Sequence, residues 1–121
     1  MGITVIMGAS NNPQRYSCKA ISKLNKYGFD FIPLGIRKGE VEGKVIQNIA
    51  ERPELTNVDT VTLYMNQVHQ KEFYEYIIGL QPRRIIFNPG TENPELKMLA
   101  SQSGIETIED CTIVMLELGN Y

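Results

Sequence analysis

Segments of β-strand character alternate with segments of helical character along almost the whole chain. The strand-like segments are short, apolar and rich in β-branched or aromatic residues, and they cover residues 3–7, 29–34, 59–65, 84–88 and 105–108. In the helical segments, apolar residues recur three or four positions apart. Strands joined by crossover helices lie parallel, with helices on both faces of the sheet. The sequence therefore predicts an α/β fold, a Rossmann-like doubly wound parallel sheet of about five strands, in a single domain over residues 1–121.

Helix boundaries follow from cap and stop residues. The first helix ends at Gly28, and it begins either at Pro13, with Asn12 as its cap, or after a turn that continues to Tyr16. Downstream of it, residues 35–43 are expected to form a loop because they contain three glycines and charges of both signs. Residues 44–50 are either a short helix or an irregular run.

The later helices also begin at residues suited to capping. Asn66, Asn93 and Asp110 each precede a helical segment, and the last of these segments covers residues 111–118. The helix after Asn66 is expected to turn inward an apolar face made of Val68, Phe73, Tyr76, Ile77 and Leu80. The last helix is apolar on most sides, so it either packs on its own sheet or offers a surface for a homodimer or a partner subunit.

Composition restricts the partners. The chain is 42% hydrophobic and 21% charged, which is ordinary for a soluble globular protein, and its net charge is −2. An acidic chain has no general attraction for nucleic acid or for an anionic membrane, so an anion site must be local. No apolar run approaches membrane-spanning length and no secretion signal opens the chain, so we expect a cytoplasmic protein.

The first strand runs directly into a polar turn that opens a helix, which is how α/β folds present backbone N–H groups to a phosphate. Of the three glycines of the dinucleotide fingerprint, the turn has only the first, Gly8. Its side chains either hydrogen-bond a phosphate or fold the turn on itself. We expect the ligand contacts to come from Gly8, Ala9, Ser10, Asn12, Arg15, Tyr16 and Ser17.

Three other strand ends are expected to meet this turn, because ligands of doubly wound sheets bind at the carboxyl ends of the strands. No acid ends the second strand, where folds that bind NAD place one for the ribose hydroxyls, and two cations follow instead. Such cations suit a ribose that carries a phosphate, as in NADP or coenzyme A. The remaining candidate ligand-binding residues are Arg37, Lys38, Met65, Asn66, Asn88, Pro89 and Gly90.

Three stretches of the chain resemble a known family. Residues 5–17 (VIMGASNNPQRYS), 86–96 (IFNPGTENPEL) and 110–116 (DCTIVML) are similar to the small stand-alone CoA-binding proteins, which are related to the N-terminal CoA-binding domain of the succinyl-CoA synthetase α subunit. The resemblance spans nearly the whole chain. It implies a Rossmann-like CoA-binding fold, with the first turn holding the CoA phosphates and the basic residues after the second strand near the adenosine end. The phosphorylated histidine of the synthetase belongs to a second domain that this sequence does not contain.

The sequence contains no recognisable catalytic constellation or metal-ligand spacing. Its single histidine, His69, is expected in the first turn of a helix, without a nucleophile beside it. Cys18 and Cys111 are expected to be buried free thiols, although Cys18 at a helix start could instead have a lowered pKa and be reactive. We therefore predict a non-catalytic module that binds CoA or acyl-CoA. The alternatives are an NADP- or nucleotide-binding protein, or a subunit of an acyl-CoA enzyme whose catalytic groups lie on a partner chain.

Overall fold

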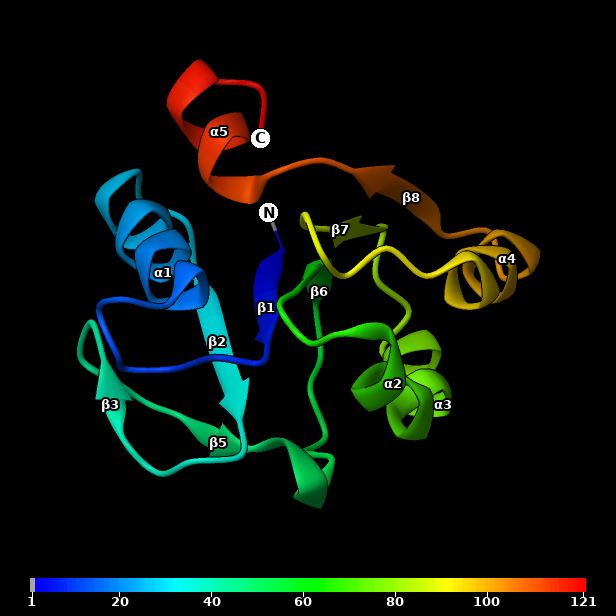
Figure 1. The fold of residues 1–121 in the computed structure, drawn as a ribbon, viewed down its shortest axis with the longest axis horizontal. Helices are drawn as coiled ribbons and strands as arrows, with labels where there is room; N and C mark the ends of the chain where they lie inside the picture. The colour runs from blue at the N-terminus through cyan, green and yellow to red at the C-terminus, as the bar shows by residue number, and fades with distance from the viewer. Residues whose placement is uncertain (1) are drawn as a thin grey trace.

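A computed structural model describes residues 2–121 and contains the predicted parallel sheet (Figure 1). Its strand order is β5-β2-β1-β6-β7-β8, and every neighbouring pair is parallel. The strands are β1 (Ile3–Met7), β2 (Phe31–Gly35), β5 (Gln47–Asn48), β6 (Val58–Leu63), β7 (Arg84–Phe87) and β8 (Glu106–Glu109). The sixth strand, beyond the expected five, is β5, which lies in the stretch whose sequence was ambiguous. The expected loop contains β3 (Glu40–Val41), which forms a hairpin with β4 (Lys44–Val45) at the start of the ambiguous stretch.

Helices cover both faces of the sheet. The helical elements are α1 (Tyr16–Lys26), η1 (Ile49–Glu51), α2 (Gln67–Gln70), η2 (Lys71–Phe73), α3 (Tyr74–Gly79), α4 (Pro94–Gln102) and α5 (Thr112–Leu118), where η denotes a 3-10 helix. Helices α1 and α5 contact each other on one side, and α3 and α4 contact each other on the other side, next to α2 (Figure 1). The doubly wound arrangement is therefore confirmed.

The core has two halves because successive side chains of a strand point to opposite faces. Along β1, Val5 and Met7 pack with Phe73 of η2, Ile77 of α3 and further residues of α4. Ile6, between them, joins the other half, which includes residues of α1 and α5. All three of these β1 side chains are fully buried, so β1 forms the centre of the sheet.

The first helix and two caps agree with the sequence. Helix α1 starts at Tyr16, the later of the two alternatives, and Gly28 follows its last turn with a φ of +81°. Asn66 accepts a hydrogen bond from the His69 amide, and Asn93 accepts from the first amides of α4. These caps are local interactions, which is why the sequence predicts them.

Two expectations about the later helices were wrong. The expected long helix after Asn66 is divided into α2, η2 and α3, and Val68 is 79% exposed whereas Gln70 is fully buried. Asp110 does not cap α5: its carboxylate accepts from the adjacent Cys111 amide, and Cys111 is the N-cap residue without a side-chain hydrogen bond. Helix α5 packs on its own sheet: the Thr112 hydroxyl hydrogen-bonds with the Thr62 hydroxyl of β6, and Leu116 packs in the same half of the core as Ile6 of β1. Leu118 at the end of the helix is 71% exposed.

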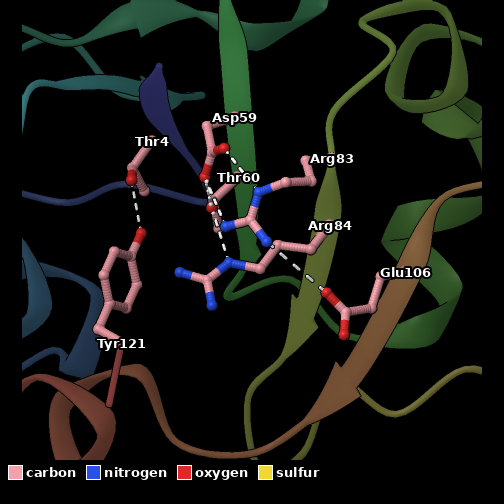
Figure 2. A network of polar contacts seen from close by, with 7 residues as sticks. All are labelled: Thr4, Asp59, Thr60, Arg83, Arg84, Glu106 and Tyr121. Atoms are coloured by element: carbon pink, nitrogen blue, oxygen red, sulfur yellow. Dashed lines mark hydrogen bonds and ion pairs between the residues drawn. The ribbon is translucent and has the colours of Figure 1, made fainter. Parts of the chain in front are cut away.

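A network of polar contacts connects four strands near their amino ends (Figure 2). Asp59 receives two hydrogen bonds from the Arg83 guanidinium, at 2.8 and 3.2 Å, and a third from the Thr60 hydroxyl. Arg84 is buried: its Nε donates to Thr60, and its guanidinium lies 4.5 Å from the centre of the Tyr121 ring. This edge lies opposite the carboxyl ends of the strands, and it ties the last residue of the sequence to the centre of the sheet.

Candidate ligand-binding cleft

A large cleft lies where the strand order reverses. From β1 the chain moves outward through β2 and β5, and it then returns to the other side of β1 as β6. Loops that leave β1 and β6 in opposite directions open a crevice between them, which is the usual ligand site of this architecture. Here a cleft of about 1060 Å³ lies at the carboxyl ends of β1, β2, β6 and β7.

The structure brings nearly all of the predicted ligand-binding residues to this cleft. Only Lys38 does not line it. The predicted residues that do line it are Gly8, Ala9, Ser10, Asn12, Arg15, Tyr16, Ser17, Arg37, Met65, Asn66, Asn88, Pro89 and Gly90. Arg37 and Lys38 are adjacent in an exposed loop, and the direction of that loop decides which of the two faces the cleft.

Two glycines allow the loops around the cleft to approach closely. Gly8 has a φ of +97°, and a Cβ atom there would lie 2.9 Å from Cγ of Met65. A Cβ atom on Gly35 would lie 2.5 Å from the backbone oxygen of Ala9. Contacts this short exclude a side chain, so the turn after β1 rests directly on the ends of β2 and β6.

The side chains of the first turn partly fold it on itself, which was one of the two alternatives. Ser10 Oγ accepts from the Asn12 amide and Asn12 Oδ1 accepts from the Gln14 amide, each at 3.0 Å. These bonds occupy oxygen atoms only. Among residues 2–121, the Ser10 hydroxyl hydrogen and the side-chain NH2 of Asn12 remain available as donors, so the folded turn still suits an anion.

The start of α1 adds further donors. Its N-cap residue, Arg15, makes no side-chain cap, and no acidic residue lies in the first turn. The amides of Tyr16 and Ser17 have no acceptor among residues 2–121, and both residues line the cleft. Unpaired amides and the helix dipole favour an anion at this position, and the exposed Arg15 adds a full positive charge.

The cations that follow β2 have different surroundings. Arg37 lines the cleft. Lys44, by contrast, donates to the backbone oxygen of Phe31 at 2.7 Å and lies over the Phe31 ring. The carboxyl end of β2 carries Leu34 and Gly35 and no acid, as the sequence indicates. Positive charge on the cleft therefore comes from Arg15 and Arg37, and Glu72 is the acidic residue that lines it.

Asn88 anchors the wall formed after β7. Its Nδ2 donates to Thr62 Oγ1 at 2.7 Å and to the Leu63 oxygen at 2.8 Å, while its Oδ1 accepts from the Thr112 amide at 2.8 Å. Every polar atom of this buried side chain is thus used within the protein. Asn88 holds β6, β7 and α5 together, and the Pro89-Gly90 turn forms the surface that faces the cleft.

Several lining residues were missed from the sequence. Tyr64, Phe73, Cys111 and Ile113 also line the cleft. Tyr64 immediately precedes the predicted Met65, so its position at the end of a strand was a signal that could have identified it. The other three come from elements whose direction depends on packing.

Two titratable groups at or near the cleft, Cys18 and Tyr64, have raised pKa values. Burial, and the nearby Glu42, raise the pKa of the Cys18 thiol, so the alternative of a lowered pKa was wrong. Burial likewise raises the pKa of the Tyr64 hydroxyl. Cys111 was expected to be buried, but it is partly exposed at the cleft. His69 is exposed at the rim, and within residues 2–121 no three His, Cys, Asp or Glu side chains gather as metal ligands.

Comparison with known proteins gives a family-level match. A family model described as a CoA binding domain matches residues 3–117. Among solved structures, an uncharacterized protein is 50% identical, with a TM-score of 0.96 and coverage of 100% of this chain and 98% of that chain. A protein from Thermus thermophilus is 16% identical (TM-score 0.86; coverage 99% and 90%) and a conserved hypothetical protein from Pyrococcus furiosus is 23% identical (TM-score 0.79; coverage 93% and 97%). The latter two share the fold. No protein with a curated description matches the chain, and no helix within residues 2–121 is long and apolar enough to cross a membrane.

Proposed function

Because the chain belongs to the CoA-binding domain family, we propose that it binds coenzyme A or an acyl-CoA in the cleft at the carboxyl ends of β1, β2, β6 and β7. The observation that carries this proposal is the open start of α1. There the unpaired amides of Tyr16 and Ser17, together with Arg15, offer several donors and a positive charge to an anionic group. The pyrophosphate of CoA is an anion of this kind.

The proposed orientation follows from the charges along the cleft. With the pyrophosphate at the turn after β1, the phosphorylated ribose extends toward the loop after β2, where Arg37 lies and no acid competes. A ribose with two free hydroxyl groups, as in NAD, would find no carboxylate acceptor there. The volume of about 1060 Å³ reaches the upper end of the range for small-molecule sites, as a ligand with the length of CoA needs.

We propose a non-catalytic role, as a cytoplasmic binding or accessory module. The groups on the cleft that are suited to chemistry, Tyr64, His69 and Cys111, come from separate elements, and no hydrogen bond joins any two of them within residues 2–121. A nucleophile is usually activated by an adjacent base, and this arrangement supplies none. Purified protein that turns over acetyl-CoA or another thioester by itself would overturn this part of the proposal.

Calorimetric titration with CoA, dephospho-CoA, NADP and NAD tests the ligand. We expect CoA to bind most tightly, with the loss of the ribose phosphate in dephospho-CoA weakening binding about tenfold, as for one charge-assisted contact. Tighter binding of NAD than of CoA would refute the proposal, and tighter binding of NADP would support the nucleotide-binding alternative.

Two adjacent cations provide a matched pair of variants. Arg37→Ala removes a charge that lines the cleft, and Lys38→Ala removes the same charge from the next residue, which does not line it. We expect Arg37→Ala to lose most of the preference for CoA over dephospho-CoA and Lys38→Ala to retain it. If both variants lost this preference equally, the overall positive electrostatic potential of the loop, and not a contact with Arg37, would account for it.

A further inference from the structure

One buried glutamine joins two loops of the cleft. Gln70, the last residue of α2, is fully buried. Its Nε2 donates two hydrogen bonds of 2.8 Å, one to the backbone oxygen of Met65 and one to the backbone oxygen of Thr91. Met65 follows β6 and Thr91 follows β7, and both residues line the cleft. A single amide group thus connects the two loops on this side of the cleft.

The same side chain is also held from behind. Its Oε1 accepts from Asn93 Nδ2 at 2.9 Å, and Asn93 Nδ2 also donates to the Tyr74 hydroxyl at 2.8 Å. Asn93 Oδ1 in turn caps α4 by accepting from the Glu95 and Leu96 amides. Both donors and the acceptor of the Gln70 amide therefore have partners, and α4 fixes their orientation.

We propose that Gln70 is the positioning residue of this cleft, which sets the distance between the loops after β6 and β7 and thereby the shape that the ligand meets. The inference rests on the proposed function for its ligand and on the hydrogen bonds for its structural part. One side chain can bond to both carbonyl oxygens only if it carries two donors. The NH2 of an amide has two, whereas a carboxylate and a hydrocarbon have none. Without those donors, the carbonyls of Met65 and Thr91 lose a buried partner, and the two loops separate or admit water.

Variants at position 70 test this proposal directly. Gln70→Glu replaces the donors with a carboxylate, and Gln70→Leu removes the polar atoms without adding charge. Gln67→Glu is the matched control for charge, because Gln67 is an exposed residue at the start of the same short helix and does not line the cleft. Tyr121→Ala is the control for lost stability, since that residue lies at the opposite edge of the sheet (Figure 2).

The first readout is CoA affinity, measured by titration at a temperature where circular dichroism shows each variant to be folded. We expect Gln70→Glu and Gln70→Leu to bind CoA about tenfold more weakly than Gln67→Glu and Tyr121→Ala, as for two lost hydrogen bonds between uncharged groups. Affinity in both position-70 variants within twofold of the controls would overturn the proposal. If one variant does not fold, the other still decides the outcome.

The second readout is amide hydrogen exchange without ligand, which separates this inference from the proposed function. The Thr91 amide bonds to the Asn88 oxygen and the His69 amide bonds to Asn66, so each reports on one of the two loops. We expect both amides to exchange at least severalfold faster in the position-70 variants, with the central strand amide of Val61 unchanged. Unchanged exchange at Thr91 and His69 would overturn the inference. Wild-type protein that fails to bind CoA would refute the proposed function, while the exchange data would still decide whether Gln70 holds the loops.

Discussion

Gly8 combines a positive backbone φ with a contact that leaves no space for a side chain, and these two costs can be measured separately. An alanine at this position adopts the φ of +97° and places its Cβ 2.9 Å from Met65 Cγ and 3.1 Å from the backbone carbon of Tyr64. The unfavourable φ costs about 1–2 kcal/mol. Pushing the β6 loop away adds about 1–3 kcal/mol, as for an overpacked site.

Gly28 provides the comparison that isolates the second cost. Its φ is +81°, and no atom lies within 4 Å of the position that a Cβ would occupy. Gly28→Ala therefore meets the backbone cost alone, about 1–2 kcal/mol, whereas Gly8→Ala, which meets both costs, is expected to lose about 2–5 kcal/mol of unfolding free energy. For a domain of this length, each kcal/mol corresponds to a shift of roughly 3–6 °C in Tm.

Urea denaturation monitored by circular dichroism measures both variants on the same scale. Gly8→Ala is also expected to weaken CoA binding, because the turn after β1 can no longer rest on the end of β6, while Gly28→Ala keeps the affinity of the wild-type protein. Equal stability loss in the two variants would refute the argument from close approach. A destabilised Gly8→Ala protein that binds CoA normally would refute the link between this contact and the site.

Three further predictions concern regions outside the β1 turn. Tyr121→Ala removes the ring that lies over the buried Arg84 guanidinium and that packs edge-on against Phe29, with ring centroids 4.9 Å apart. We expect the free energy of unfolding, measured by urea denaturation, to fall by about 2–4 kcal/mol. A fall below about 0.5 kcal/mol would contradict the role assigned to the network in Figure 2. Hydrogen bonds from Arg83 hold the pKa of Asp59 below its usual value, so the stability from this half-exposed pair is present above about pH 4 and is lost as the pH falls further. Asp59→Asn should therefore make the unfolding free energy depend less on pH in the acid range. An unchanged dependence on pH would contradict this. Cys111 should react with iodoacetamide at least tenfold faster than Cys18 at pH 8, because Cys111 is partly exposed at the cleft whereas Cys18 is buried and burial raises its pKa. Peptide mapping that finds equal rates would contradict that difference.

The outcome at the cleft shows where reasoning from sequence ends. The four strand ends were expected to converge, and they do, because the carboxyl ends of parallel strands necessarily share one edge of the sheet. The sequence also suggested that both Arg37 and Lys38 serve the site. Only Arg37 lines the cleft, since the direction of a side chain in a loop depends on how the loop packs.

The region after β6 shows the same limit in a helix. Apolar periodicity predicted that Val68 faces the core, whereas the chain buries Gln70 and exposes Val68. The reason is that the backbone oxygens of Met65 and Thr91 both accept hydrogen bonds from the Gln70 side chain. These two oxygens lie close together only because β6 and β7 are neighbours in the sheet. Asn88 is a similar case, because its amide is fully used by partners that are distant in the sequence.

The sequence by itself determined the parallel doubly wound fold, the strand-turn-helix at residues 3–26, the glycine at position 8 and the absence of an acid after the second strand. These are properties of local patterns, and neighbouring residues are enough to produce them. Only the tertiary structure decided which polar side chains face the cleft and which ones, such as Gln70 and Asn88, hold it in shape. A buried polar group must find its partners wherever the fold places them, so its role is set by the contacts between elements and not by its neighbours in the chain.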